Sequence, residues 1–167
     1  DTMNTWSAVR DARFEEARRL DPRDPRAAYY LGELERQQQH WNEAEQRFRE
    51  ALALRPTMAE AHASLGAVLR EAGRLPDAVS SLQQALRLSP TLGEARYNLG
   101  LCLEDQGQRL QAIAEYRRAA QQLPSDPMPS LNLGLALAAT EGLTPAQRAE
   151  AVNALREAAR RGDRDRD

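Results

Sequence analysis

The chain has 167 residues, of which 41% are hydrophobic, 5% aromatic and 29% charged, and its 23 basic and 25 acidic residues leave a net charge of −2. This balance argues against nucleic-acid binding, which needs an excess of basic side chains, and no apolar run approaches the roughly 20 residues that cross a membrane. Cys102 is the single cysteine, which excludes an intramolecular disulfide framework and a cysteine-rich zinc site.

The first 24 residues predict one helix, over about 5–20. Its pattern is that of the second helix of a two-helix repeat whose first helix is absent. Arg10 stands where the later repeats place a small residue, at Ala44 and its equivalents. An arginine fits there if no partner helix packs closely. Segment 1–24 is therefore either a genuine N-terminal capping helix, which forms a half repeat, or a degenerate repeat cut at its start.

From residue 25 onward the sequence repeats itself every 34 residues. Two residue types mark the period: Pro22, Pro56, Pro90 and Pro124, and Gly32, Gly66, Gly100 and Gly134. Glycine makes up only about 7% and proline about 5% of an average chain, so four of each in register are no coincidence. Between these markers the apolar residues recur with helical spacing. The sequence therefore predicts four helical hairpins, over 25–58, 59–92, 93–126 and 127–161.

Small residues and turn residues indicate how each hairpin is built. Gly32 and Ala44 allow the two helices of the first hairpin to approach closely. A proline after the second helix stops it, because proline cannot continue a helix. Gly73 and Gly107 fall in the turns between helices, where a left-handed backbone is needed.

The last hairpin departs from the period. Its second-helix pattern resumes five residues late, at Ala151, which places an insertion near 140–145. Within it an N-cap, a first-position proline and a capping box are predicted at Thr144, Pro145 and Gln147. The final helix therefore starts about a turn early. Residues 162–167 alternate in charge and predict a frayed polar tail.

This pattern resembles the tetratricopeptide repeat family, in which a Leu-Gly pair, an alanine, a large apolar residue, a second alanine and a proline recur every 34 residues. In the first repeat these residues are Leu31, Gly32, Ala44, Phe48, Ala51 and Pro56. The resemblance implies an all-α fold, a right-handed α-α superhelix (a solenoid) of about nine antiparallel helices. It also implies a concave face lined mainly by the first helix of each pair. The family carries aromatic residues in its first helix, and this chain departs from that pattern, for example with alanine at position 28.

The resemblance further implies which side chains face inward. As peptide-binding residues we predict Arg26, Tyr29, Tyr30, Glu33 and Arg36 in the first repeat, Arg70 in the second, Tyr97, Asn98 and Leu101 in the third, and Met128, Leu131, Asn132 and Leu135 in the fourth. Glu60 and Ser64 occupy further inward positions. The lining is polar at its N-terminal end and apolar at its C-terminal end. Tyrosine and arginine are common anchors of protein interfaces.

Two narrower functions of the family can be judged from these positions. A clamp for a terminal carboxylate needs basic residues, but Glu33 and Glu94 are acidic and would repel it. An asparagine ladder that holds a peptide backbone retains two rungs, Asn98 and Asn132, while Tyr30 and Ser64 interrupt it. These two asparagines either bind a backbone or bond only to water.

The sequence therefore predicts a non-catalytic scaffold or adaptor that binds a peptide or helix of a partner protein, with the partner's apolar residues toward the fourth repeat. Alternatively, the apolar end is covered by the 140–145 insertion or by sequence outside this chain. His40 and His62 lack a second ligand at metal spacing. We therefore expect no metal, no cofactor and no enzymatic activity.

Two other functional readings remain open. The chain could be the partner- or substrate-recruiting arm of a larger bacterial enzyme or assembly, such as a glycosyltransferase, although the interrupted asparagine ladder counts against that enzyme. It could also be a structural module that self-associates through Trp6 and Val9 at one end and Val152 and Leu155 at the other. All basic residues besides histidine are arginine, which favours a high-GC bacterial gene. One buried thiol suits either the bacterial cytoplasm or the periplasm.

Overall fold

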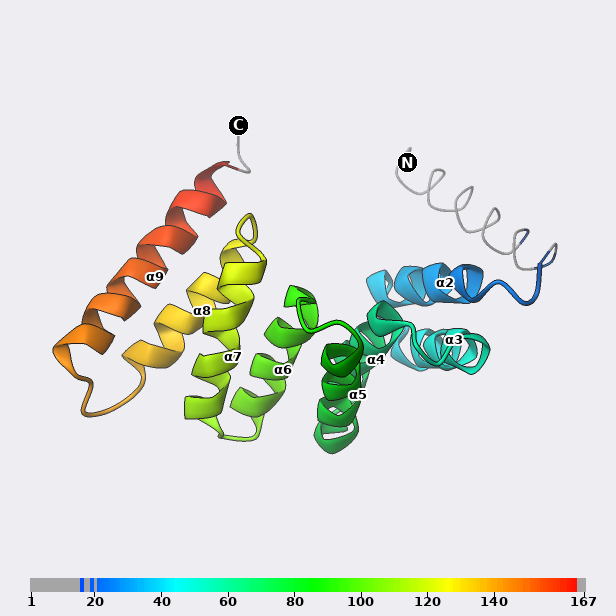
Figure 1. The fold of residues 1–167 in the computed structure, drawn as a ribbon, viewed down its shortest axis with the longest axis horizontal. Coiled ribbons are helices and arrows are strands. Elements are labelled where there is room, and N and C mark those ends of the chain that lie inside the picture. Colours follow the sequence, from blue (N-terminus) through cyan, green and yellow to red (C-terminus); the bar gives the residue numbers. More distant parts are fainter. Residues whose placement is uncertain (1–15, 17–18, 20, 165–167) are drawn as a thin grey trace. The chain divides into compact units, whose positions relative to one another are not determined.

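The computed structural model describes residues 16, 19 and 21–164, and this part of the chain contains helices and no strand. The helices, labelled in Figure 1, are α2 (Pro25–Gln37), α3 (Trp41–Leu54), α4 (Ala59–Glu71), α5 (Leu75–Leu88), α6 (Gly93–Asp105), α7 (Arg109–Gln122), α8 (Pro127–Ala138) and α9 (Pro145–Arg164). The all-α class is confirmed. The described part holds eight helices where the sequence predicts about nine, because the helix predicted over 5–20 lies outside the described residues except for Glu16 and Arg19.

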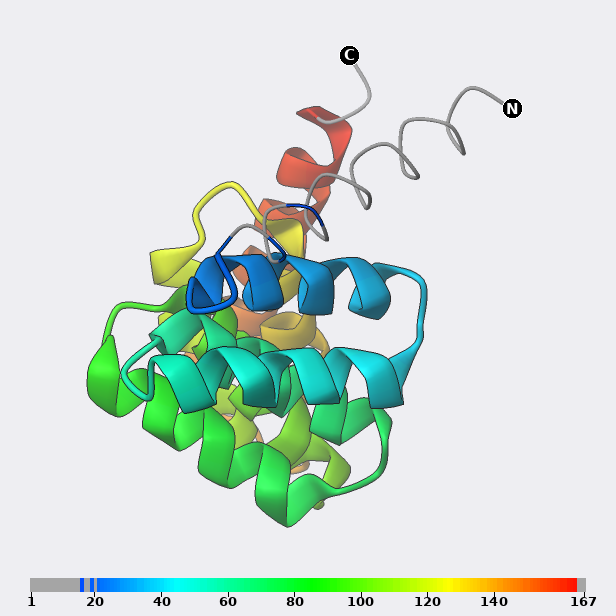
Figure 2. The ribbon, with the colours of Figure 1, turned by 90° about the vertical axis from the view of Figure 1, so that its right-hand side faces the viewer.

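The chain divides into two compact units, residues 1–90 and 91–167, called here the N-terminal and C-terminal units. In the N-terminal unit α2 pairs with α3 and α4 with α5, and α3 packs on α4. Figure 2 shows α2 and α3 running side by side in opposite directions. In the C-terminal unit α6 pairs with α7 and α8 with α9, and α7 packs on α8.

Each hairpin is closed by a glycine that lies under a large apolar side chain. A Cβ added to Gly32 would lie 2.7 Å from the Phe48 ring, and one added to Gly66 would lie 2.5 Å from Leu82 Cγ. The equivalent neighbours in the C-terminal unit are Tyr116 for Gly100 and Leu155 for Gly134. Such distances leave no room for a methyl group. The close approach predicted for these glycines is therefore confirmed.

The repeated prolines stand just outside the second helices, as the sequence predicts. Helix α3 ends at Leu54 and its C-cap, Arg55, has an extended backbone (φ −139°, ψ 90°) immediately before Pro56. Ser89, before Pro90, has nearly the same angles (φ −137°, ψ 90°). Proline forces the preceding residue out of the helical region, so the chain leaves the helix at this point and turns into the next hairpin.

The turns inside the hairpins need a left-handed residue. Gly73 and Gly107 have φ of +74° and +75°, as predicted. In the first hairpin the same place is taken by Gln39, with φ +63°. A side chain in this region costs roughly 1–2 kcal/mol because its Cβ crowds the backbone carbonyl.

We expect Gln39→Gly to raise the free energy of unfolding by about 0.5–1 kcal/mol, because glycine relieves this crowding. The matched change Gly73→Ala, at a site with no other atom within 4 Å of the added Cβ, should lower it by a similar amount. Urea denaturation of the two variants checks both signs. A Gln39→Gly protein no more stable than the original would contradict the assignment of strain to this turn.

The last hairpin has the longer connection that the sequence predicts. Thr144 and Gln147 form a reciprocal capping box, in which each backbone N–H donates to the other's side chain, at 2.9 Å and 3.3 Å. Helix α9 begins at Pro145, as expected, but continues to Arg164. A helix through residue 164 differs from the tail predicted to begin at 162. Arg161 accounts for part of this order, because it bonds Ser130 Oγ at 3.0 Å and the Glu157 carboxylate at 3.0 Å.

Ion pairs join the second helices of successive hairpins within each unit. Glu45 on α3 accepts from Arg49 at 2.9 Å and from Arg74, the residue before α5. Burial raises the pKa of the Glu45 carboxyl, but the bonds from the two arginines outweigh it and hold this pKa below its usual value. On the C-terminal unit, Arg117 donates to Glu150 at 2.6 Å, and this bond raises the pKa of Arg117.

Candidate binding surfaces

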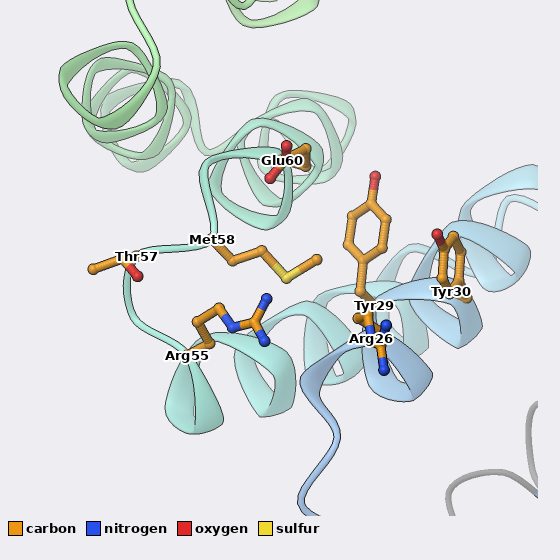
Figure 3. Close-up of a pocket in the computed structure, with 7 residues that line it drawn as sticks. All are labelled: Arg26, Tyr29, Tyr30, Arg55, Thr57, Met58 and Glu60. Atoms are coloured by element: carbon orange, nitrogen blue, oxygen red, sulfur yellow. The ribbon is translucent and has the colours of Figure 1, made fainter.

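The N-terminal unit contains a hollow of about 460 Å³ between the start of α2 and the loop that joins α3 to α4. It is lined by Arg26, Tyr29, Tyr30, Arg55, Thr57, Met58 and Glu60. In Figure 3 the Met58 side chain points toward Tyr29, and Glu60 stands at the opposite rim from Arg55. Three of the predicted binding residues, Arg26, Tyr29 and Tyr30, therefore share one site.

Tyr29 and Met58 form the apolar part of this hollow. Tyr29 packs against Phe48, with ring centroids 5.9 Å apart, and makes a T-shaped contact with Tyr30, with ring centroids 5.4 Å apart. Met58 is only 9% exposed and belongs to the core cluster with Ala28, while Tyr29 lies partly buried against that cluster. Tyr30 is 48% exposed. The hollow thus combines an anchored aromatic floor with an exposed aromatic wall.

Arg26 is held by the cap of its own helix. Its guanidinium pairs with Asp24 at 2.8 Å, and its backbone N–H donates to the same carboxylate at 2.9 Å. The side-chain bond first, and then the backbone bond, lower the pKa of Asp24. Asp24 at the N-cap and Pro25 in the first turn fix the start of α2. The guanidinium of Arg26 is therefore paired with the N-cap of its own helix.

Arg55, Thr57 and Met58 are not among the residues predicted from the sequence. Pro56 was expected only to stop a helix, yet its neighbours face the start of α2. The sequence pattern could have predicted this position. In antiparallel hairpins the loop that follows a second helix lies beside the start of the first helix of its own hairpin and leads into the start of the next one. Among the residues that the structure describes, Arg55 makes no side-chain hydrogen bond or ion pair, but its charge contributes to the lowered pKa of Asp24.

Further along the first helices, Glu33 forms a small network rather than an open site. It pairs with Arg36 at 2.7 Å and accepts a short hydrogen bond from Ser64 Oγ, which joins α2 to α4. Arg70, on α4, pairs with its neighbour Glu71 at 3.0 Å. These predicted residues lie apart from the hollow, and their charges are largely satisfied within the unit.

In the C-terminal unit the predicted residues of α6 and α8 come together. The amide of Asn132 donates to the Tyr97 hydroxyl at 3.1 Å, and the Tyr97 ring lies 6.0 Å from that of Tyr116. Asn98 instead donates to the carbonyl of Glu94, on its own helix, at 3.0 Å. The two asparagines therefore have different partners within the protein, so they are not equivalent rungs.

An apolar stripe follows these first helices. Met128, Leu131 and Leu135 stand at i, i+3 and i+7 on α8, where Met128 is 43% and Leu135 53% exposed. Leu131 is half-buried, as are Tyr97 and Leu101 on α6. The 140–145 insertion therefore does not cover this end of the stripe. Leu155, predicted at an exposed edge, instead lies against Gly134, while Val152 is 46% exposed. Trp6 and Val9 lie outside the described residues.

The groups that could carry chemistry are engaged elsewhere. His40 pairs with Glu35 at 2.8 Å, and His62 bonds the carbonyl of Pro56 at 2.9 Å. Cys102 is fully buried in the core, as its apolar register predicts. Within the described part of the chain no cluster of His, Cys, Asp or Glu could hold a metal ion. The same part contains no helix with the length and apolar character of a membrane span.

The family is decided by comparison with known sequence patterns. A tetratricopeptide repeat model matches residues 9–46, 34–92 and 65–127. The chain belongs to the tetratricopeptide repeat (TPR) family. A search of curated proteins found no significant match.

Solved structures share the TPR fold at low sequence identity. PilW, a widely conserved type IV pilus biogenesis factor, has a TM-score of 0.80 and 23% identity, covering 97% of this chain and 73% of PilW. YrrB, a TPR protein with an unusual peptide-binding site, has a TM-score of 0.66 and 24% identity, and the match covers 96% of this chain and 80% of YrrB. MamA from Desulfovibrio magneticus RS-1 has a TM-score of 0.69 and 21% identity, and the match covers 96% of this chain and 86% of the MamA chain. These likenesses support the fold of the chain.

Proposed function

We propose that this TPR protein is a non-catalytic scaffold that binds a peptide or helix of a partner protein on the first-helix face of its C-terminal unit. The apolar stripe of Met128, Leu131 and Leu135, in which Met128 and Leu135 are exposed, carries the proposal. Because the three side chains line one face of α8, the apolar face of an amphipathic partner segment can pack along them. Burying one such side chain contributes roughly 1.5–3 kcal/mol before the costs of association.

The residues around this stripe define the chemistry of the partner. Glu94 stands three residues before Tyr97 and Glu104 three residues after Leu101, so both lie near the side of α6 that carries Tyr97 and Leu101, and both are exposed. No basic residue is predicted among the inward positions of α6 and α8. The face is therefore apolar with an acidic edge, which suits an amphipathic segment that has leucine-like anchors and flanking lysine or arginine.

YrrB, which shares the fold, has a peptide-binding site, and this supports peptide binding as the function of the present chain. A recruiting role within a larger bacterial assembly is compatible with the same surface, since a scaffold contributes the binding step in either case. Self-association has less support. Leu155 packs over Gly134 within its own hairpin, so of the two residues predicted at that end only Val152 is exposed.

Selection of twelve-residue peptides from a random display library on the immobilised protein tests the proposal. We expect the selected peptides to carry apolar residues at helical spacing with basic flanks. Leu135→Asp should weaken their binding at least tenfold, because it replaces the most exposed apolar side chain of the stripe with a charge. The matched control is Leu110→Asp on α7, where the side chain is 72% exposed. Equal losses in both variants would contradict this binding face.

A further inference from the structure

We propose that the hollow of the N-terminal unit is a second, separate site that takes an internal peptide segment with an acidic, an apolar and a basic residue in sequence. The proposal goes beyond the function argued for the C-terminal unit, since it uses other residues and asks for a different ligand. It rests on the shape of the hollow and on two charged side chains at its rims.

The apolar residue of the segment would occupy the space between Tyr29, Tyr30 and Met58. Tyr29 and Met58 are anchored against the core cluster, so this floor is already ordered before binding. Tyr30, which is 48% exposed and packs against Tyr29, adds an aromatic wall that an inserted aromatic or aliphatic side chain can contact. Preformed aromatic surfaces of this kind lose little conformational entropy on binding.

The charges at the rims select the flanking residues. Arg55 and Glu60 both line the hollow, and neither makes a side-chain hydrogen bond or ion pair with the described residues, although the charge of Arg55 helps to lower the pKa of the nearby Asp24. Arg26 differs, because its guanidinium is already bound to Asp24. In Figure 3 Met58 lies between Arg55 and Glu60, and Tyr29 stands beside Met58. A ligand that crosses the hollow therefore meets a cation at one rim and an anion at the other.

This arrangement favours an internal segment over a chain end. A free C-terminal carboxylate could pair with Arg55 but would supply no basic residue beyond the apolar one for Glu60. A segment with residues on both sides of its apolar anchor can satisfy both rims at once. Charge complementarity of this kind determines which sequence binds and in which register.

A double-mutant cycle on defined peptides tests the inference. The probe is a fluorescein-labelled, acetylated and amidated ten-residue peptide with a central Glu-Phe-Lys, compared with Gln-Phe-Lys, Glu-Phe-Gln and Glu-Ala-Lys forms by fluorescence anisotropy at low salt. On the unmodified protein we expect Glu-to-Gln or Lys-to-Gln to weaken binding about threefold to fivefold, as for partly exposed ion pairs. Phe-to-Ala should weaken it at least tenfold.

The variants Arg55→Gln and Glu60→Gln should each abolish the discrimination at their own rim and leave the other intact. Arg87→Gln, which removes an exposed arginine of α5 from the same unit, should leave both intact. The C-terminal variant Leu135→Asp should bind the probe normally, which separates this result from the function proposed above. Absence of binding, or equal discrimination by Arg55→Gln and the unmodified protein, would overturn the proposal. So would tighter binding of a peptide that ends in a free Phe carboxylate.

Discussion

Replacing Tyr116 with alanine is expected to lower the free energy of unfolding by about 3–5 kcal/mol, the largest effect of any single substitution considered for this protein. Tyr116 is fully buried, and its ring covers Gly100, where an added Cβ would lie 2.5 Å from a ring carbon. The side chain therefore fills the interface between α6 and α7. Its hydroxyl also donates to Glu104 at 2.7 Å. Removal of the ring leaves a cavity that a glycine-containing helix cannot fill.

Tyr116→Phe is the matched control for this prediction. It keeps the ring over Gly100 and removes only the bond to Glu104, so it should cost about 1 kcal/mol. Chemical denaturation followed by circular dichroism gives both values. If Tyr116→Ala lost no more stability than Tyr116→Phe, packing over the glycine would not be what holds this hairpin together.

Gly66→Ala is expected to destabilise the protein by about 1–3 kcal/mol, although alanine is normally about 1 kcal/mol better than glycine inside a helix. The added methyl group would lie 2.5 Å from Leu82 Cγ and 3.1 Å from the carbonyl oxygen of Ala78. Leu82 is fully buried, and Ala78 contributes a backbone atom. Neither can move away without separating α4 from α5.

The opposite sign is expected at Gly162, in the last turn of α9. No atom outside its own helix lies within 4 Å of a Cβ built there. Gly162→Ala should therefore raise the free energy of unfolding by up to about 1 kcal/mol, following helix propensity alone. Thermal melts of the two variants compare the signs directly. A stabilising Gly66→Ala would show that the hairpin tolerates a wider spacing than the structure indicates.

The fold was largely predictable because its determinants recur. Gly32 and its equivalents, and Pro56 and its equivalents, appear at a fixed period, and each has the local role that its chemistry requires. Gln39 occupies a turn position where glycine is expected, and the turn still forms, because a left-handed backbone is costly for a residue with a side chain but is tolerated. The extension of α9 to Arg164 was not predictable from its alternating charges, since it involves Arg161 reaching Ser130 on another helix.

The candidate surfaces were only partly predictable. Tyr29 and Tyr30 were identified through their inward register, but the residues that complete their hollow come from the junction around Pro56. Likewise, the sequence placed Asn98 and Asn132 in equivalent positions, yet one bonds its own helix and the other bonds Tyr97. Register predicts which way a side chain faces. It does not predict which neighbour satisfies that side chain.

Binding of a partner through the first helices of the C-terminal unit can be tested by an NMR titration of leucine methyl signals with a selected peptide. We predict that the methyl signals of Leu101, Leu131 and Leu135 shift, reaching half of their full change when free peptide equals its dissociation constant, while the Leu110 signals stay unchanged. Shifts confined to Leu110, on α7, or no methyl shift at saturating peptide, would contradict it.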